Sequence, residues 1–380
     1  MKDRCIILKN ICIFGWYGTE TLGDRAILDG ICLILSKAYG EYNIYLGSLY
    51  PFLTERTLFE DGLILKQSSN NAQIEIFDER SPRIRNQIIR KSDLILMGGG
   101  PLMDLEELYI ILNSFIKAKA LHKKTALIGC GFGPLFKNEY LKCTIKILEY
   151  SDLIIFRDRL SSDRAGLLYK SNKILYSLYD PAVFSIMNFK NNSIVLPDKY
   201  AVLNLREYPQ EAYGGANFLN PVDLVKNLST HYEKVYLVPM HTFFIGGDDR
   251  KFLTEITAKT DSDNVNVIHD TLNLYELYNF YLNAESCIGM RYHSIVMQTI
   301  LNGNNIALNY TDSVNGKIPG FFKEIDNNDF YANRIINLQS QQTHDYEQLI
   351  GLLKNSQKFE FQYRPQDIEI YSKLLIHLNI

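Results

Sequence analysis

The sequence lacks a strong charge of either sign, a closely spaced cysteine motif and a long apolar run. Its formal net charge is −3 over 380 residues, so it shows no basic balance and predicts no nucleic-acid partner. The six cysteines have no C-x-x-C spacing, which predicts buried thiols in a reducing compartment and no bound metal. No segment reaches the roughly 18 apolar residues of a membrane span. We therefore expect a cytoplasmic protein without a transmembrane helix.

Targeting and nucleotide-binding motifs are also missing. Lys9 interrupts the apolar run near the first residue and no small-residue cleavage site follows, so we expect no signal peptide. No glycine-rich turn reads G-x-G-x-x-G with an acidic residue about 20 positions later, and none reads G-K-[ST]. The sequence thus gives no support for a dinucleotide or P-loop site, and we expect no cofactor.

Short apolar runs that alternate with longer amphipathic ones are present instead, and they predict parallel sheets covered by helices. The predicted strands of the first half are Ile11–Gly15, Ile44–Gly47, Ile74–Phe77, Leu94–Met97, Ala126–Gly129, Leu153–Phe156 and Lys173–Tyr176. Those of the second half are Ala201–Leu205, Lys234–Val238, Val265–Ile268, Ser286–Gly289 and Ile306–Asn309. The predicted helices are Asp24–Tyr39, Leu105–Leu121, Glu139–Tyr150, Ser161–Leu168, Asn220–Tyr232, Asp248–Lys259, Leu272–Leu282, Ser294–Leu301, Ser313–Phe322, Tyr346–Lys354 and Pro365–Leu378.

This pattern predicts an α/β protein with two Rossmann-like, doubly wound domains that face a cleft. The first domain spans residues 1–187 and the second spans 200–345, with C-terminal helices over 346–380. The polar stretch Asn188–Lys199 is the predicted linker, and residues 323–346 are expected to be irregular. Ligands of such folds bind beyond the carboxyl ends of the strands, so side chains at strand ends are the candidates for a site.

Three predicted strands of the first half end in glycine-rich turns, at Phe14–Gly30, Asp93–Asp104 and Ala126–Leu135. Glycine permits sharp turns and close approach of a ligand to the backbone. Packing alone also explains a single turn of this kind, whereas three together favour a lined site. The residues that we expect to meet a sugar acceptor here are Gly18, Thr21, Gly99, Gly100 and Gly131.

Two aspartates stand near the starts of predicted helices in the same half. Asp24 follows Gly23, and Asp104 closes the second glycine-rich turn. Each either caps a helix, which stabilises by about 1 kcal/mol, or orients and deprotonates an acceptor hydroxyl as a general base. The two roles are compatible at one residue.

Arg206 and His241 follow predicted strands of the second half. Arg206 either faces the cleft or is a surface arginine paired with Glu207 or Glu211. The loop 207–219, rich in tyrosine and glycine, could form a lip over the site. We also expect His241, in a turn before Asp248 and Asp249, to meet the sugar acceptor. Helix capping is the simpler interpretation of at least one of these two aspartates.

The segment "CIGMRYHSIVMQTILNG", residues 287–303, carries two potential cations in an apolar surrounding. Arg291 and His293 lie between a predicted strand and a predicted helix, and no acidic residue occurs between Ser286 and Tyr310. A helix N-terminus favours an anion by about 0.3–1 kcal/mol, and a hydrogen bond to a charged group contributes about 1.5–3 kcal/mol. We therefore expect an anionic ligand here. The alternative is that Arg291 pairs with a carboxylate distant in sequence and His293 is a core histidine.

These motifs in this order resemble the polysaccharide pyruvyltransferase family. The segments that carry the resemblance are "GWYGTETLGDRAIL", "DLILMGGGPLMD", "ALIGCGFGP", "SDLIIFRDRLSSD", "LYDPAVF", "VPMHTFFIGGDDR" and "SCIGMRYHSIVMQTILNG". They run from Phe14 to about Lys317, which is most of the chain. Family members usually have asparagine near Thr21 and often an acidic residue in place of Arg25, and these departures concern the acceptor.

The resemblance implies a fold like that of the GT-B glycosyltransferases and transfer of the carboxyethylidene group of phosphoenolpyruvate onto two hydroxyls of a sugar. The products would be a pyruvate ketal and phosphate, in a capsule, exopolysaccharide or other cell-surface glycan. By the family pattern, Arg206, Arg291, Tyr292 and His293 contact phosphoenolpyruvate. His293 is the candidate for holding phosphate as an imidazolium and for supplying a proton. If the acceptor is lipid-linked, the protein would work at the inner face of the plasma membrane.

Two other functions fit the fold class. A GT-B glycosyltransferase would use a nucleotide-sugar donor, and those enzymes usually place a glutamate in the last βα region of the second domain. The absence of a carboxylate between Ser286 and Tyr310 argues against that function. A non-catalytic sugar-binding protein with a decayed site is the other alternative, and the intact set of Arg206, Arg291 and His293 argues against it.

Overall fold

The computed structural model describes residues 8–19, 21–195, 198–208, 219–243, 247–339, 345–355 and 357–380. By packing, the chain divides into two units. The first unit contains residues 1–20, 24–185 and 364–380, and the second contains residues 21–23 and 186–363. The last helix therefore belongs to the first unit. The five described cysteines are buried with free thiols, and Cys5 lies outside the described residues.

A parallel sheet forms the centre of the first unit, with strand order β3-β2-β1-β4-β6-β7-β8 and β5 paired to β6. Its strands are β1 (Lys9–Phe14), β2 (Tyr42–Ser48), β3 (Gln73–Asp78), β4 (Leu94–Gly98), β5 (Pro101–Leu102), β6 (Lys124–Phe132), β7 (Leu153–Phe156) and β8 (Tyr176–Ser177). The central strand β4 is buried along its whole length. Such continuous apolar runs are typical of parallel strands that are covered on both faces.

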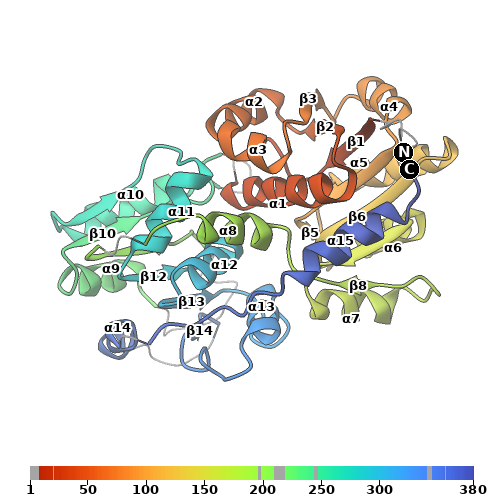
Figure 1. The fold of residues 1–380 in the computed structure, drawn as a ribbon. Helices are drawn as coiled ribbons and strands as arrows, with labels where there is room; N and C mark the ends of the chain where they lie inside the picture. Colours follow the sequence, from red (N-terminus) through yellow and green to blue (C-terminus); the bar gives the residue numbers. More distant parts are fainter. Residues whose placement is uncertain are drawn as a thin grey trace. The chain divides into compact units, whose positions relative to one another are not determined.

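Helices cover both faces of this sheet (Figure 1). They are α1 (Leu22–Tyr39), α2 (Pro51–Glu60), α3 (Gly62–Ser68), α4 (Pro82–Lys91), α5 (Leu108–Ala120), α6 (Asn138–Tyr150), α7 (Arg159–Leu168), α8 (Ala182–Asn191), which continues into the second unit, and α15 (Gln366–Ile376). One core joins Cys12, Phe14 and Met97 of the sheet to apolar side chains of α4 to α7. Tyr371 of α15 is fully buried and donates a hydrogen bond to the Tyr179 carbonyl at 2.8 Å.

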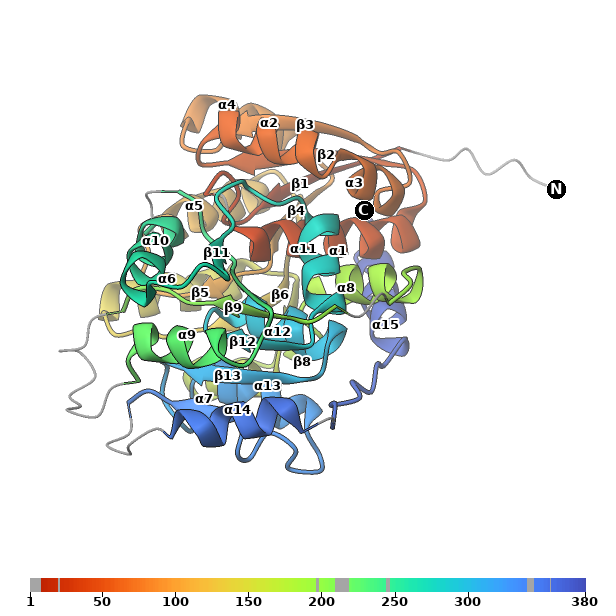
Figure 2. The ribbon, with the colours of Figure 1, turned by 90° about the vertical axis from the view of Figure 1, so that its left-hand side faces the viewer.

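The second unit has its own parallel sheet, in the order β11-β10-β9-β12-β13-β14. The strands are β9 (Tyr200–Asn204), β10 (Lys234–Leu237), β11 (Val265–Val267), β12 (Ser286–Gly289), β13 (Asn305–Asn309) and β14 (Ile335–Asn337). The helices are α9 (Pro221–Ser229), α10 (Asp249–Thr260), α11 (Leu274–Asn283), α12 (Tyr292–Leu301), α13 (Lys317–Ile325) and α14 (Tyr346–Lys354). Helices α9 and α14 lie side by side against one face (Figure 2).

The strand order reverses between β1 and β4 in the first sheet and between β9 and β12 in the second, as it does in doubly wound folds. The predicted α/β class with two Rossmann-like domains is confirmed, and the fold is GT-B-like. Several local predictions are wrong. The predicted linker begins inside α8, which extends to Asn191, and the stretch expected to be irregular contains β14. Helices α2, α3 and α4 were missed. No helix in the described ranges combines the length and the apolar character that a membrane crossing requires.

Candidate functional site

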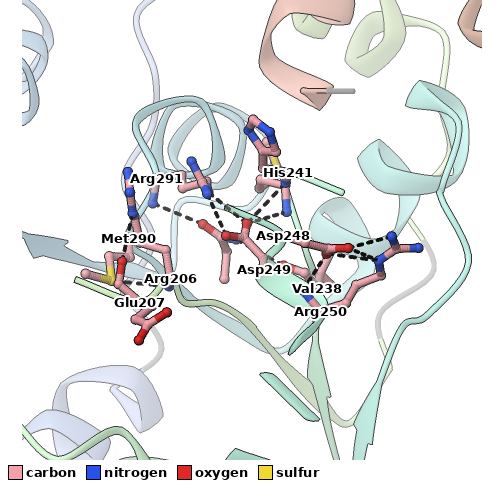
Figure 3. A network of polar contacts seen from close by, with 11 residues as sticks. Arg206, Glu207, Val238, His241, Asp248, Asp249, Arg250, Met290 and Arg291 are labelled. Atoms are coloured by element: carbon pink, nitrogen blue, oxygen red, sulfur yellow. Dashed lines mark hydrogen bonds and ion pairs between the residues drawn. The ribbon is translucent and has the colours of Figure 1, made fainter. Parts of the chain in front are cut away.

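Arg291 and Asp249 form the central ion pair of a polar network in the second unit (Figure 3). Arg291 occupies the N-cap position of α12, two residues after the end of β12, and Asp249 is the first residue of α10. The guanidinium donates from Nε to Oδ2 at 2.7 Å and from Nη2 to Oδ1 at 2.6 Å. The carboxylate is 2 % exposed and the arginine side chain 17 %. The geometry is that of a two-pronged charge-assisted hydrogen bond.

This pair corrects the expectation that Arg291 has no carboxylate partner within the protein. The segment around Arg291 contains no acid, but Asp249 comes from 42 positions earlier in the chain, across the sheet. Asp249 also accepts hydrogen bonds from the main-chain N–H groups of Met240 and His241, both at 3.1 Å. The alternative of a carboxylate distant in sequence is therefore correct for Arg291. The neighbouring Asp248 is a helix cap, as the simpler interpretation held.

The pair fixes the arginine and leaves one edge of it for other contacts. Asp249 engages Nε and Nη2, so Nη1 lies on the other edge of the guanidinium. The main-chain N–H of Arg291 donates to Asn204 Oδ1 at 3.0 Å, and Asn204 in turn donates to the Val238 carbonyl at 3.0 Å. The ends of β9, β10 and β12 are thereby tied together. A side chain held at both its main chain and its guanidinium is preorganised to meet an anion.

A second group of cations surrounds Tyr310, which directly follows β13. The Arg206 guanidinium carbon and the Lys317 ammonium each lie 5.4 Å from the centroid of the Tyr310 ring. Lys317 is the first residue of α13. Burial by itself raises the pKa of Tyr310. The positive charges of Lys317, Arg206 and Arg291 together outweigh burial and lower this pKa to about 8. Positive charge therefore dominates at this ring.

Arg206 forms no ion pair with the Glu207 carboxylate in the described residues, whereas its predicted alternative partner Glu211 lies outside them. Its Nε donates to the main-chain oxygen of Glu207 at 3.2 Å, rather than to a carboxylate. Its main-chain N–H approaches the Met290 sulfur at 3.5 Å. Glu211 and most of the predicted lip, residues 209–218, lie outside the described residues. Together with Arg291 and Lys317, Arg206 makes a group of three cations at the carboxyl ends of β9, β12 and β13.

His293 and Tyr292 occupy the first turn of α12. The partly exposed His293 ring stacks edge-on against Tyr292, with 5.0 Å between centroids. Tyr292 is 5 % exposed and packs on Phe321 as well. A Cβ on Gly23 would lie 2.2 Å from His293 Nδ1. Gly23 is therefore a close-approach glycine that leaves room for the imidazole.

Two acceptor candidates, Thr21 and His241, are brought together in the second unit. They form an isolated antiparallel bridge, and the Leu22 N–H donates to the Met240 carbonyl at 3.1 Å. His241 is 6 % exposed. Residues 21–23 thus pack with the turn that supplies two N–H groups to Asp249.

The remaining acceptor candidates lie in the first unit, and neither aspartate is a helix cap. Helix α1 begins at Leu22, so Asp24 lies inside its first turn, where its charge adds to burial in raising the pKa of Tyr17. Helix α5 begins at Leu108, and Asp104 Oδ2 instead accepts from the N–H groups of Phe136 and Lys137 at 2.9 and 3.1 Å. Both cap alternatives are wrong because the helices begin at other residues.

The glycines of the first unit differ among themselves. Gly18, Gly99 and Gly100 have φ of +86°, +70° and +68°, so these turns require glycine. Gly131 lies inside β6 rather than in a turn, and a Cβ there would be 2.8 Å from Arg157 Nη2. The third predicted turn is therefore wrong at this position, because β6 continues to Phe132.

Four contributors to the network were missed from the sequence: Asn204, Asp249 as an ion-pair partner, Tyr310 and Lys317. A signal existed for the last two, since both follow the predicted strand Ile306–Asn309 just as Arg206 follows an earlier strand. Asp249 carried no such signal, because its pairing depends on two turns distant in sequence. Within the described part of the chain, no group of three or more histidine, cysteine or acidic side chains is arranged to hold a metal ion.

Comparison with known proteins gives a family and a fold. The family model described as polysaccharide pyruvyl transferase matches residues 22–313. No curated protein sequence matches the chain. Among solved structures, a putative UDP-N-acetylglucosamine 2-epimerase from Listeria monocytogenes is similar, with a TM-score of 0.62, 13% identity and 98% and 96% of the two chains covered.

Two further structures show the same fold. The UDP-GlcNAc 2-epimerase from Neisseria meningitidis, bound to UDP-GlcNAc, has a TM-score of 0.58 and 12% identity over 97% and 99% of the two chains. A protein from Anabaena in complex with UDP and glucose has a TM-score of 0.55 and 9% identity over 98% and 99%. At such identities the likeness concerns the fold alone.

Proposed function

Because the chain belongs to the polysaccharide pyruvyl transferase family, we propose that it moves the carboxyethylidene group of phosphoenolpyruvate onto two hydroxyls of one sugar. The acceptor is a sugar of a cell-surface polysaccharide or of its lipid-linked precursor. The products are a cyclic pyruvate ketal and phosphate. With a lipid-linked acceptor the protein acts at the inner face of the plasma membrane. No cofactor is needed beyond the donor.

The observation that carries this proposal is the grouping of Arg206, Arg291 and Lys317 at the ends of three adjacent strands. Asp249 balances one of these cations, which leaves an excess of positive charge. Phosphoenolpyruvate presents a phosphate and a carboxylate, so it suits several cations. Helices α12 and α13 also begin here, and their N-termini favour anions.

The chemistry follows from these charges. A proton added to the methylene carbon of the donor makes the neighbouring carbon electrophilic, and one sugar hydroxyl adds there with loss of its proton. Phosphate then departs, and the second hydroxyl adds to close the ring. Fixed cations stabilise the phosphate as its bond breaks, and removal of one such fixed donor typically costs about 10²–10³ in rate. His293, at the start of α12, holds the phosphate as an imidazolium cation.

The two arginines and the lysine of this group have different tasks in this scheme. Arg291 is rigidly oriented by Asp249 and presents a planar edge to the phosphate. Arg206 and Lys317 are anchored around Tyr310 and suit the donor carboxylate or the bridging oxygen. The acceptor roles of Asp24, Asp104, Gly18, Thr21, Gly99, Gly100, Gly131 and His241 stay predictions.

The test compares donors directly. The protein is incubated with phosphoenolpyruvate and a panel of lipid-linked or nitrophenyl sugars, and phosphate release and product mass are measured. We expect phosphate release with at least one acceptor and a product heavier by a carboxyethylidene group. Turnover of a UDP-sugar with no phosphate released from phosphoenolpyruvate would replace this function by glycosyl transfer.

Arg291→Lys is the sharpest variant for the donor. A lysine ammonium is a point charge and cannot keep both a two-pronged bond to Asp249 and a planar edge toward phosphate. We expect phosphate release to fall by about 10²-fold or more. Arg250→Lys is the matched control, because Arg250 forms a similar pair with Asp248 on a partly exposed surface. Equal rates in the two variants would show that Arg291 serves structure alone.

A further inference from the structure

Tyr310 differs from the other tyrosines of the protein in its charged surroundings. It follows β13 at the start of a turn, and its ring is partly exposed. Lys317 approaches from α13, Arg206 from the end of β9, and Arg291 acts from the start of α12. The charged groups with the largest effect on the pKa of this phenol are Lys317, Arg206 and Arg291, which are all cations.

The contrast with other tyrosines shows that this arrangement is local. Burial raises the pKa of Tyr200, Tyr281 and Tyr331, each to a value above the usual range. Among the described tyrosines whose pKa departs from the usual value, Tyr310 is the one whose pKa is lowered, to about 8, because the charges of Lys317 and Arg206 outweigh burial. A phenol with a pKa of about 8 is mostly protonated near pH 7 and mostly ionised near pH 9.

We propose that Tyr310 is the proton-carrying residue of the anion site, taking up a proton when a phosphate-bearing ligand binds to Arg206, Lys317 and Arg291. The physical reason is charge compensation. In the empty site the three cations favour phenolate. An anion that pairs with them withdraws that support, so the phenol form becomes the stable one. Ligand binding and proton uptake are therefore linked at one side chain.

This inference deepens the proposed function and rests on it for the step that follows binding. The phenol, loaded with a proton by donor binding, protonates the methylene carbon of phosphoenolpyruvate. The resulting phenolate accepts the proton of the first acceptor hydroxyl as that oxygen bonds to the neighbouring carbon. The second hydroxyl proton leaves with the phosphate. Tyr310 ends the cycle as it began, and no other reactant is required.

The size of the linkage follows from the two pKa values. If a bound anion returns the pKa of Tyr310 from about 8 to its ordinary value near 10, uptake amounts to about 0.8 proton per site near pH 9 and about 0.1 near pH 7. Titration calorimetry in two buffers of different ionisation enthalpy measures this number. The probes are phosphoenolpyruvate and inorganic phosphate, each added to the full-length protein.

Two variants make the measurement specific. Tyr310→Phe keeps the three cations and the ring, so we expect it to bind the anion with no proton uptake near pH 9. Tyr275→Phe, on an exposed part of α11, is the control and should behave as the wild type. In the transfer assay Tyr310→Phe should lower kcat by about 10²–10⁴-fold, as for removal of a general acid, with a smaller change in KM.

The outcomes separate this inference from the proposed function. Uptake near pH 9 that is equal in wild type and Tyr310→Phe overturns the proposal, as does binding of neither anion. If proton uptake on phosphate binding depends on Tyr310 but the protein transfers nothing from phosphoenolpyruvate, the proton linkage is supported and the transferase function is refuted. Transfer that proceeds normally in Tyr310→Phe overturns the catalytic step.

Discussion

Asp249→Ala is predicted to be among the most damaging substitutions in the second unit, although Asp249 lies on no apolar face. Its carboxylate accepts from Arg291 Nε and Nη2 at 2.7 and 2.6 Å and from the N–H groups of Met240 and His241 at 3.1 Å. Alanine removes all of these acceptors at once. A nearly buried guanidinium and two buried N–H groups would then be left without them.

The expected magnitude comes from the burial of the pair. Removing one partner of a buried ion pair typically costs about 3–5 kcal/mol, because the other charge stays buried and uncompensated. This is a large share of a typical free energy of unfolding, about 5–15 kcal/mol. In the double variant Asp249→Ala/Arg291→Ala the stranded charge is absent. Its loss should therefore fall short of the sum of the single losses by about 1–3 kcal/mol.

Urea unfolding followed by far-ultraviolet circular dichroism measures these losses. Trp16 is the single tryptophan and belongs to the first unit, so its fluorescence provides a second signal from that unit. Asp248→Ala is the control, since Asp248 caps α10 and pairs with Arg250 at a partly exposed position. We expect it to cost about 1 kcal/mol. Equal losses at positions 248 and 249, or strict additivity with Arg291→Ala, would refute the reasoning.

Two further predictions concern a buried carboxyl group and a close approach. Burial raises the pKa of Glu79 from 4.5 to about 8, so between these pH values the folded protein keeps a proton that the unfolded chain loses. The wild type therefore loses stability as the pH rises from about 4.5 to 8, whereas Glu79→Gln has no such proton to lose. The variant should become more stable than the wild type over this range, by about 3 kcal/mol near pH 7. Unfolding at several pH values checks this, and a constant difference between the two proteins would contradict it. Gly23→Ala should displace His293, because the new Cβ would lie 2.2 Å from Nδ1. Phosphate release should fall in this variant while Gly62→Ala, at an open position, leaves it unchanged; normal release in Gly23→Ala would show that the imidazole position is unimportant.

The sequence predicts the parallel architecture well because buried strands leave a strong local signal. Runs such as Leu94–Met97 are apolar at every position, and the structure has β4 there with each residue buried. The short strands β5 and β14 were missed because two or three residues give no periodicity. Helices α2 and α4 begin with proline after Tyr50 and Ser81, a start signal that was available in the sequence.

The candidate site was predictable only as far as strand ends reveal it. Arg206 and Arg291 each lie two residues after the end of a strand of one sheet, and His293 lies in the first turn of α12. The pairing of Arg291 with Asp249 was not predictable, because it depends on how the turns after β10 and β12 meet. A segment free of acids says nothing about acids that neighbouring strands supply. Charge balance is a property of the folded neighbourhood rather than of a stretch of sequence.

The return of α15 to the first unit has a consequence for how the protein is made. Residues 364–380 pack with residues 24–185, and Tyr371 buries its ring against Phe184 and bonds to the Tyr179 carbonyl. During synthesis the chain emerges from its N-terminus, so the first unit waits for its final helix while the second unit is completed. The half that is translated first is thus finished last. Its contacts of long sequence separation also predict slow folding of this unit.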